Sequence, residues 1–283
     1  MEQKFKLTKE IKIYAGRAVY RIEALRDTPF CKKGEKGGWL ACEANLSQDG
    51  DCWVGGDAYV YDFALVWGDA LVTDNACIGG SSQVFERARV GGDAYVDGNA
   101  IICENARVYG HAYVRMSAAV GGSSQICDKA LITDHAKIFG YAEISEDAKV
   151  GGNSTVGGSV HGRAIVSGKA LVGEDAVIED DAQIFGRARV GCNNPPLRLS
   201  VGGFAEIGGD AVVDTIEDFI VFKNWWSSGR YLTWTRSNKM WRVGCFCGEG
   251  DALVSKAYKK GDKCGREYER LVSYVESFLE EGH

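Results

Sequence analysis

Four histidines are the side chains in this sequence best suited to general acid–base chemistry. His111 and His135 each hold the second position of a six-residue unit, where Asp or Asn is common, so we expect them to face solvent at corners, and His283 is the last residue. At Gly158–His161 four residues replace six. Because an irregular corner projects its side chain differently, His161 is the candidate general base if the protein is an enzyme.

Arginines near an irregular segment form a second candidate site, for an anion. Residues 192–202 depart from the six-residue pattern and hold two of the three prolines, which is typical of a loop. Loops on rigid scaffolds often carry function, although an insertion without a role is equally compatible with the pattern. Guanidinium and amide groups there could bind an anionic ligand through charge-assisted hydrogen bonds. The candidate residues are Asn193, Asn194, Arg198, Arg163, Arg187 and Arg189.

Other kinds of chemistry have little support. Among ten cysteines the only close pair, Cys245 and Cys247, lacks the C-x-x-C spacing of zinc and redox sites, so we expect no metal. Phosphate-loop, zinc-protease and nucleophile-elbow motifs do not occur. The polar start lacks a signal peptide, and no apolar run approaches the roughly twenty residues of a membrane span. We therefore expect reduced thiols, no membrane and a cytoplasmic location.

These residues must be positioned by a repeat of six residues that runs without a gap over residues 50–157. Units such as GDAYVY (56–61) and GDALVT (68–73) place a small residue third and Val or Ile fifth. On an extended strand, residues two apart share a face, so Ala58 and Val60 point inward together. Three units make one coil of about eighteen residues, and coils stack at the strand spacing of roughly 4.8 Å. The pattern predicts a three-sided parallel β-solenoid.

The flanking segments break the repeat, which predicts three parts: a β cap at 1–49, the solenoid at 50–214 and an α+β domain at 215–283. Alternating residues and a break at Ala15-Gly16 indicate a hairpin that caps the first coil. Net charge is about +3, −10 and +1 over these parts. An acidic repeat without a basic stripe argues against binding extended nucleic acid.

The last segment has the pattern of a small mixed domain. Residues 219–222, 231–235 and 240–244 read as strands, and helices are expected at about 251–260 and from about 265. Four of the seven tryptophans lie here, and most must be core because a small domain needs large side chains. Trp225 and Trp226 are adjacent and would face opposite sides of a strand, so one of them could form a contact surface.

A group of about eighteen residues at the entry to the repeat carries a family resemblance. They are Gly37-Gly38-Trp39-Leu40, Asn45-Leu46-Ser47 and Gly50-Asp51-Cys52-Trp53-Val54. This segment resembles bacterial and bacteriophage proteins of the YdcK type, which are grouped with acyltransferases because of their hexapeptide repeats. Segments 234–237, 244–246 and 265–268 are similar to the ends of prophage-encoded relatives. The resemblance implies a left-handed β-helix and a bacterial host cell, but no established chemistry.

Two functions remain open at this point. Catalysis would be acyl transfer from acetyl-CoA with His161 as base, as the resemblance to hexapeptide acyltransferases implies. A non-catalytic binding protein needs only the rigid face, the loop and exposed aromatic residues, and fold alone licenses no activity. We favour binding because no partner for a catalytic base is evident. The expected partner is a host protein or a small anionic nucleotide-derived signal, with an anti-defence role suggested by the prophage relatives, and self-association as a trimer is favoured.

Overall fold

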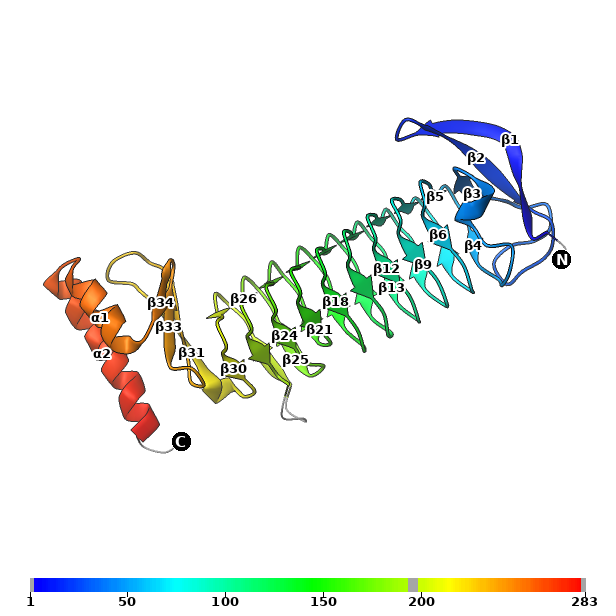
Figure 1. Cartoon of the computed structure of the whole chain (residues 1–283). Helices are drawn as coiled ribbons and strands as arrows, with labels where there is room; N and C mark the ends of the chain where they lie inside the picture. Colours follow the sequence, from blue (N-terminus) through cyan, green and yellow to red (C-terminus); the bar gives the residue numbers. More distant parts are fainter. Residues whose placement is uncertain (1–2, 193–197, 281–283) are drawn as a thin grey trace.

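The computed structural model describes residues 3–192 and 198–280 as a three-sided parallel β-solenoid with a smaller unit at each end (Figure 1). Short parallel strands stack into three sheets, and we name each face after its first strand in the prism. Within the described residues the β4 face and the β6 face hold nine strands each, while the β5 face belongs to a twelve-stranded sheet that includes β1, β2 and β3. The predicted parallel β-solenoid is confirmed.

The prism strands are only two or three residues long. The β4 face contains β4 (Trp53–Val54), β7 (Leu71–Val72), β10 (Arg89–Val90), β13 (Arg107–Val108), β16 (Gln125–Ile126), β19 (Glu143–Ile144), β22 (Ser159–Val160), β25 (Ala176–Ile178) and β28 (Leu199–Val201). The β5 face contains β5 (Tyr59–Val60), β8 (Cys77–Ile78), β11 (Tyr95–Val96), β14 (Tyr113–Val114), β17 (Leu131–Ile132), β20 (Lys149–Val150), β23 (Ile165–Val166), β26 (Gln183–Ile184) and β29 (Glu206–Ile207). The β6 face contains β6 (Leu65–Val66), β9 (Gln83–Val84), β12 (Ile101–Ile102), β15 (Ala119–Val120), β18 (Lys137–Ile138), β21 (Thr155–Val156), β24 (Leu171–Val172), β27 (Arg189–Val190) and β30 (Val212–Val213).

The interior follows from the alternation of small and branched side chains. Ala58 and Val60 are fully buried, and the third and fifth residues of the later units repeat this pattern. The first residue of most units takes a left-handed backbone conformation, with φ of +58° at Gly56 and +59° at Asp74; Gly158 and Glu174 are exceptions. Glycine reaches that region without strain, and Asp tolerates it better than most residues. This backbone conformation explains why Gly and Asp are frequent at the first position of the units.

Corner carboxylates also complete the backbone hydrogen bonding between coils. Asp74 Oδ2 accepts the amide N–H of Gly92 at 2.8 Å, and Asp134 Oδ2 accepts that of Gly152 at 2.7 Å. Each pair lies eighteen residues apart, which is one coil. Part of the acidic charge of the repeat therefore has a structural origin, because a carboxylate at a corner satisfies an amide on the next coil. Glu86, Glu104, Asp128 and Asp180 make the same contact.

Two irregularities change the length of a coil. The partners Ile144 and Val160 are sixteen residues apart, which confirms the predicted four-residue unit. Gly158 permits this tight step, because a Cβ there would lie 2.2 Å from the carbonyl oxygen of Ala176. Farther on, Gln183 and Glu206 are twenty-three residues apart. The predicted loop at 192–202 is too long, because its last residues return to the solenoid as β28.

The N-terminal cap extends one face instead of lying flat across the end. Strands β1 (Phe5–Tyr14) and β2 (Arg17–Ala24) form the predicted hairpin, β3 (Lys36–Leu40) pairs with β2, and β3 also pairs in parallel with β5. A short 3₁₀ helix (Glu43–Asn45) leads into the first coil. The hairpin stands on the flank of the prism, where its tip reaches along the β5 face (Figure 1).

The C-terminal unit is an antiparallel sheet packed against two helices within the described residues. Its elements are a 3₁₀ helix (Ile216–Asp218), β31 (Phe219–Lys223), β32 (Tyr231–Thr235), β33 (Met240–Val243), β34 (Phe246–Gly248), α1 (Gly250–Tyr258) and α2 (Asp262–Glu280). Trp234 and Trp241 are buried in its core, as predicted. The Thr233 hydroxyl accepts the Glu206 amide at 2.8 Å, so this sheet adjoins the last coil. No helix in the described ranges is long and apolar enough to cross a membrane.

Candidate functional site

The arginines that the sequence suggested as one anion site lie at three different corners of the prism. Arg163 follows the β4 face, Arg187 follows the β5 face, and Arg198 directly precedes β28 at the third corner. Arg163 is already paired with Asp181, at 2.6 Å. The structure therefore does not bring these arginines together. Asn193 and Asn194 lie outside the described residues.

The tryptophan pair is exposed on one side, but it lies in a turn. Trp225 is 78% exposed, whereas Trp226 is half-buried and packs edge-to-face against Tyr268 with ring centroids 5.4 Å apart. The prediction that one of them is exposed is confirmed. Their placement on a strand is wrong, because β31 ends at Lys223 and a turn follows. Trp225 thus offers a single exposed ring.

His161 lies at the corner between the β4 and β5 faces, in one column with residues from neighbouring coils. Its Nδ1 is 2.6 Å from the hydroxyl oxygen of Ser145, which occupies the same corner one coil earlier. Glu179 occupies this corner one coil later, but its carboxylate accepts a hydrogen bond from Ser200. His111 and His135 are exposed corner residues, as predicted.

The chemistry available to His161 depends on the direction of that hydrogen bond. When Nδ1–H donates to Ser145, Nε2 is unprotonated and can accept a proton as a general base. When the Ser145 hydroxyl donates, Nε2 carries the proton and the base function is lost. In serine-dependent catalysis a carboxylate accepts from Nδ1 and fixes the tautomer, whereas among the described residues the Nδ1 partner of His161 is the Ser145 hydroxyl.

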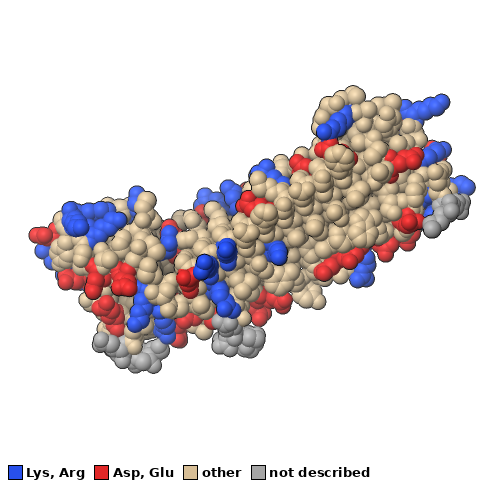
Figure 2. All heavy atoms as spheres, viewed as in Figure 1, with Lys and Arg blue, Asp and Glu red and all other residues tan. Residues whose placement is uncertain are grey.

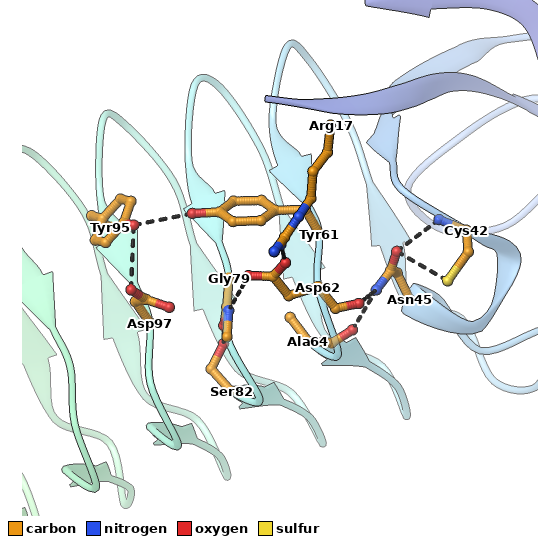
Figure 3. A network of polar contacts seen from close by, with 11 residues as sticks. Arg17, Cys42, Asn45, Tyr61, Asp62, Ala64, Gly79, Ser82, Tyr95 and Asp97 are labelled. Atoms are coloured by element: carbon orange, nitrogen blue, oxygen red, sulfur yellow. Dashed lines mark hydrogen bonds and ion pairs between the residues drawn. The ribbon is translucent and has the colours of Figure 1, made fainter. Parts of the chain in front are cut away.

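A network of polar contacts holds the hairpin to the first coils (Figure 3). Arg17 at the hairpin tip forms an ion pair with Asp62, whose carboxylate also accepts the Gly80 amide at 3.3 Å. Beside it the hydroxyls of Tyr61 and Tyr95 are 3.0 Å apart. The side chains in this network are directed at one another and not at an open groove, so the network positions the hairpin.

Aromatic stacking reinforces this attachment. The ring of Tyr14 stacks on Tyr59 with centroids 4.1 Å apart, and its hydroxyl lies 2.9 Å from the Cys77 sulfur. Burial raises the pKa of Tyr14 and of Tyr61 far above the usual value, and hydrogen bonds to Cys77 and Tyr95, respectively, add to this effect. Both phenols therefore stay protonated at neutral pH and act as packing and hydrogen-bonding groups.

A groove on the β4 face combines cationic, aromatic and small residues. Arg89 and Arg107 are directly adjacent in register on β10 and β13. Thr73 and Tyr109 lie on the neighbouring corner, on either side of Gly91. The Asp74 carboxylate lies beside Gly91, 2.8 Å from the position that a Cβ would take there. Leu71, Val90 and Val108 complete the lining. An anion in this groove would meet two guanidinium groups.

The two arginines are held differently. Arg89 donates to the carbonyl oxygen of Asp69 at 2.7 Å, and its guanidinium lies over the ring of Phe30, 4.7 Å from the centroid. Burial, and then the neighbouring charge of Arg107, lower the pKa of Arg89. Arg107 is exposed and makes no side-chain hydrogen bond or ion pair within the part of the chain that the structure describes.

The sequence contained a signal for this pair that the search for loops missed. Arg89 and Arg107 each hold the fourth, outward position of a unit, in RARV at 87–90 and ARV at 106–108. They are eighteen residues apart, which is one coil, so listing outward residues at that period would have placed them side by side.

Comparison with known proteins adds no assignment to this geometry. No protein-family model matches the chain, and no curated protein matches it. Among the described residues, no group of three or more His, Cys, Asp or Glu side chains is arranged to hold a metal ion. The described residues form a three-sided β-solenoid with a doubly cationic groove on the β4 face. A pocket in the C-terminal unit is also cationic, because Arg230, Lys256 and Lys260 line it.

Proposed function

We propose that the protein is a non-catalytic binding protein that holds a small phosphate-bearing ligand in the groove of Arg89 and Arg107. One observation carries the proposal. Among the outward residues of the three prism sheets that the structure describes, Arg89–Arg107 is the single in-register neighbour pair of like charge. Like charges directly opposite each other destabilise a sheet, so a bound anion would offset a cost that the free protein carries.

The lining residues suit a nucleotide better than a bare ion. Arginine presents a planar fork of donors that matches phosphate oxygens, and Arg89 is already fixed in position by Asp69 and Phe30. The ring of Tyr109, which is 40% exposed, offers a face on which a base can stack.

Charge over the rest of the surface confines the proposal to a small ligand. The chain has a net charge of −6, and corner carboxylates are distributed along the repeat. Figure 2 shows the face that carries β6 and β12 as largely uncharged, with acidic residues gathered along its edge. A long polyanion would meet these carboxylates, whereas a mononucleotide or dinucleotide would contact only the groove.

Isothermal titration of the full chain with inorganic phosphate, mononucleotides, cyclic mononucleotides and cyclic dinucleotides tests the proposal. We expect binding that weakens as salt rises, and a loss of about ten- to a hundredfold in affinity in Arg107→Gln, because a hydrogen bond to a charged group contributes about 1.5–3 kcal/mol. Arg115→Gln removes the same charge from another corner and should bind normally. Equal losses in both variants, or no binding by the wild-type protein, would contradict the proposal.

Acyl transfer from acetyl-CoA is the second candidate, favoured by one observation: His161 is held by Ser145 at 2.6 Å in a broken coil. A fixed imidazole with a free Nε2 could remove a proton from an acceptor amine or hydroxyl. Incubation with acetyl-CoA and a panel of amines and sugars should then release free CoA, and His161→Ala should abolish the release. CoA release that persists in His161→Ala, or no release by the wild-type protein, would argue against this candidate.

The biological setting is proposed on the resemblance at residues 37–54 alone. A phage-encoded protein of this type would sequester a nucleotide-derived signal, or bind a host protein, in the cytoplasm of a bacterial host, and so blunt a defence response. A trimer would place several grooves on one assembly. Light scattering would measure the oligomeric state, and a monomer at micromolar concentration would remove that part of the proposal.

A further inference from the structure

One buried amino group closes the open end of the first coil. Lys4, immediately before β1, is fully buried, and its Nζ donates to the carbonyl oxygens of Asp49 at 3.3 Å and Gly50 at 3.4 Å. In the next coil the equivalent carbonyl of Gly68 accepts the Cys52 amide at 2.9 Å. The first coil has no earlier coil to supply such donors, so the lysine side chain substitutes for one.

The same amino group contacts a thiol. Lys4 Nζ lies 3.0 Å from Cys52 Sγ, which is the shortest of its three polar contacts. Cys52 is fully buried and holds the inward position that Ala or Ser holds in the other complete hexads. Alanine would fill this position as well, but a thiol adds a group that oxidation turns into an electrophile next to an amine.

We propose that oxidation joins Cys52 Sγ to Lys4 Nζ by a covalent S–N bond, which fastens the N-terminal strand to the first coil. In the first step the thiol attacks hydrogen peroxide: an S–O bond forms, the O–O bond breaks, and water leaves, so that sulfur is oxidised to a sulfenic acid and peroxide is reduced. In the second step the neutral amine attacks this sulfur, the S–O bond breaks and a second water leaves. Overall, thiol, amine and peroxide give the sulfenamide and two waters.

Access to the thiol requires a movement of the cap. Burial raises the pKa of the Cys52 thiol, an effect that Lys4 opposes, and a protonated buried thiol reacts slowly with peroxide. Local opening of the segment before β1 exposes Cys52, and closure then returns Lys4 to the oxidised sulfur. The S–N bond therefore forms only after the cap has opened, and once formed it prevents the cap from opening again. A closed cap protects the unpaired edge of the solenoid from pairing with other chains.

Peptide mapping of the full-length protein tests the proposal. The protein is treated with hydrogen peroxide at neutral pH, unfolded, alkylated and cleaved after glutamate, because modified lysine resists trypsin. We expect one linked pair of peptides that contains Lys4 and Cys52, lighter than their sum by two hydrogen atoms and separated by a thiol reductant. Recovery of Cys52 only as thiol, sulfinic acid or sulfonic acid, or linked to another residue, would overturn the proposal.

The chain supplies its own control. Cys31 is also buried, but the polar side chain at its sulfur is the Thr28 hydroxyl at 3.2 Å, so it should not become linked. Cys52→Ser retains an acceptor for Lys4 and should lose both the linked peptides and the peroxide-dependent rise in melting temperature expected of the wild-type protein. Lys4→Met should leave Cys52 oxidised and unlinked. If Lys4→Met does not fold, the wild-type map with Cys31 as reference still decides the question.

Discussion

Two regions of the solenoid stack arginines across neighbouring coils with opposite results. At the corner after the β4 face, Arg163 meets Asp181 at 2.6 Å, so positive and negative charges cancel within the protein. On the β4 face itself, Arg89 meets Arg107 in register, and the charges add. In both cases the two residues are eighteen positions apart and lie on neighbouring coils. The repeat therefore decides which residues are neighbours on adjacent coils. The charges of those neighbours then decide whether they neutralise each other or leave a net positive charge that an anion can neutralise.

The broadest way to disturb both regions is to weaken the prism that carries them. Ile102 is fully buried inside the coil that leads to Arg107. Ile102→Ala should lower the free energy of unfolding by about 2–5 kcal/mol, because it removes packed methyl groups and leaves a cavity. Urea denaturation measures the loss. A change under about 1 kcal/mol would mean that the coil collapses onto the vacancy or that the interior is loosely packed.

Reversing the charge of Arg107 would give the β4 face a pair of opposite charges, like the pair of Arg163 and Asp181. Arg107→Glu should raise the free energy of unfolding by about 0.2–1 kcal/mol, since an opposite-charge pair replaces a repulsive one. The same change should reduce affinity for a phosphate-bearing ligand by more than about tenfold, because one hydrogen-bonded cation is lost. Denaturation and titration of one preparation measure both effects. Unchanged ligand affinity would place the site elsewhere.

Alkaline pH tests the attachment of the hairpin while arginine keeps its charge. Burial also raises the pKa of groups elsewhere, such as Cys103, Tyr109 and Tyr268, so a variant must separate the share of the hairpin. Burial raises the pKa of Tyr14 and Tyr61 above the unfolded value of about 10. Above about pH 10 the unfolded chain therefore loses protons that the folded chain keeps, and stability falls as pH rises. Denaturation at about pH 9 and about pH 11 should show this fall, and Tyr61→Phe should reduce it. Equal falls in both proteins would assign the effect to other groups.

The smallest expected change in unfolding free energy comes from breaking the ion pair between Arg163 and Asp181. Asp181→Asn should cost about 0.2–1 kcal/mol of unfolding free energy, because the Arg163 side chain is 71% exposed and solvent screens the pair. The cost should shrink further as salt is added. Thermal unfolding at low and high salt measures both values. A loss above about 2 kcal/mol would show that this pair carries more of the fold than its exposure implies.

Much of the fold could be predicted because the solenoid is encoded locally. Ala58 and Val60 point inward for reasons contained in six residues, and the short unit at Gly158–His161 was visible as a change of spacing. The site was harder to predict. Arg163, Arg187 and Arg198 were grouped by nearness in sequence, yet in a three-sided coil nearby residues lie at different corners. The return of the chain as β28 was hidden because Leu199–Val201 lacks the hexad pattern.

The sequence by itself determined the prism, its period and the kinds of residue at its corners, because each unit repeats the same steric requirements within a few residues of chain. Only the tertiary structure decided which charges meet across coils and how the hairpin lies along the β5 face. It also showed that a buried lysine reaches the first coil's cysteine. Such contacts join residues sixteen to sixty-three positions apart, as with Val160 and Ile144 or Tyr14 and Cys77. They depend on how many residues each intervening coil contains, so one shortened or lengthened coil changes every later neighbour.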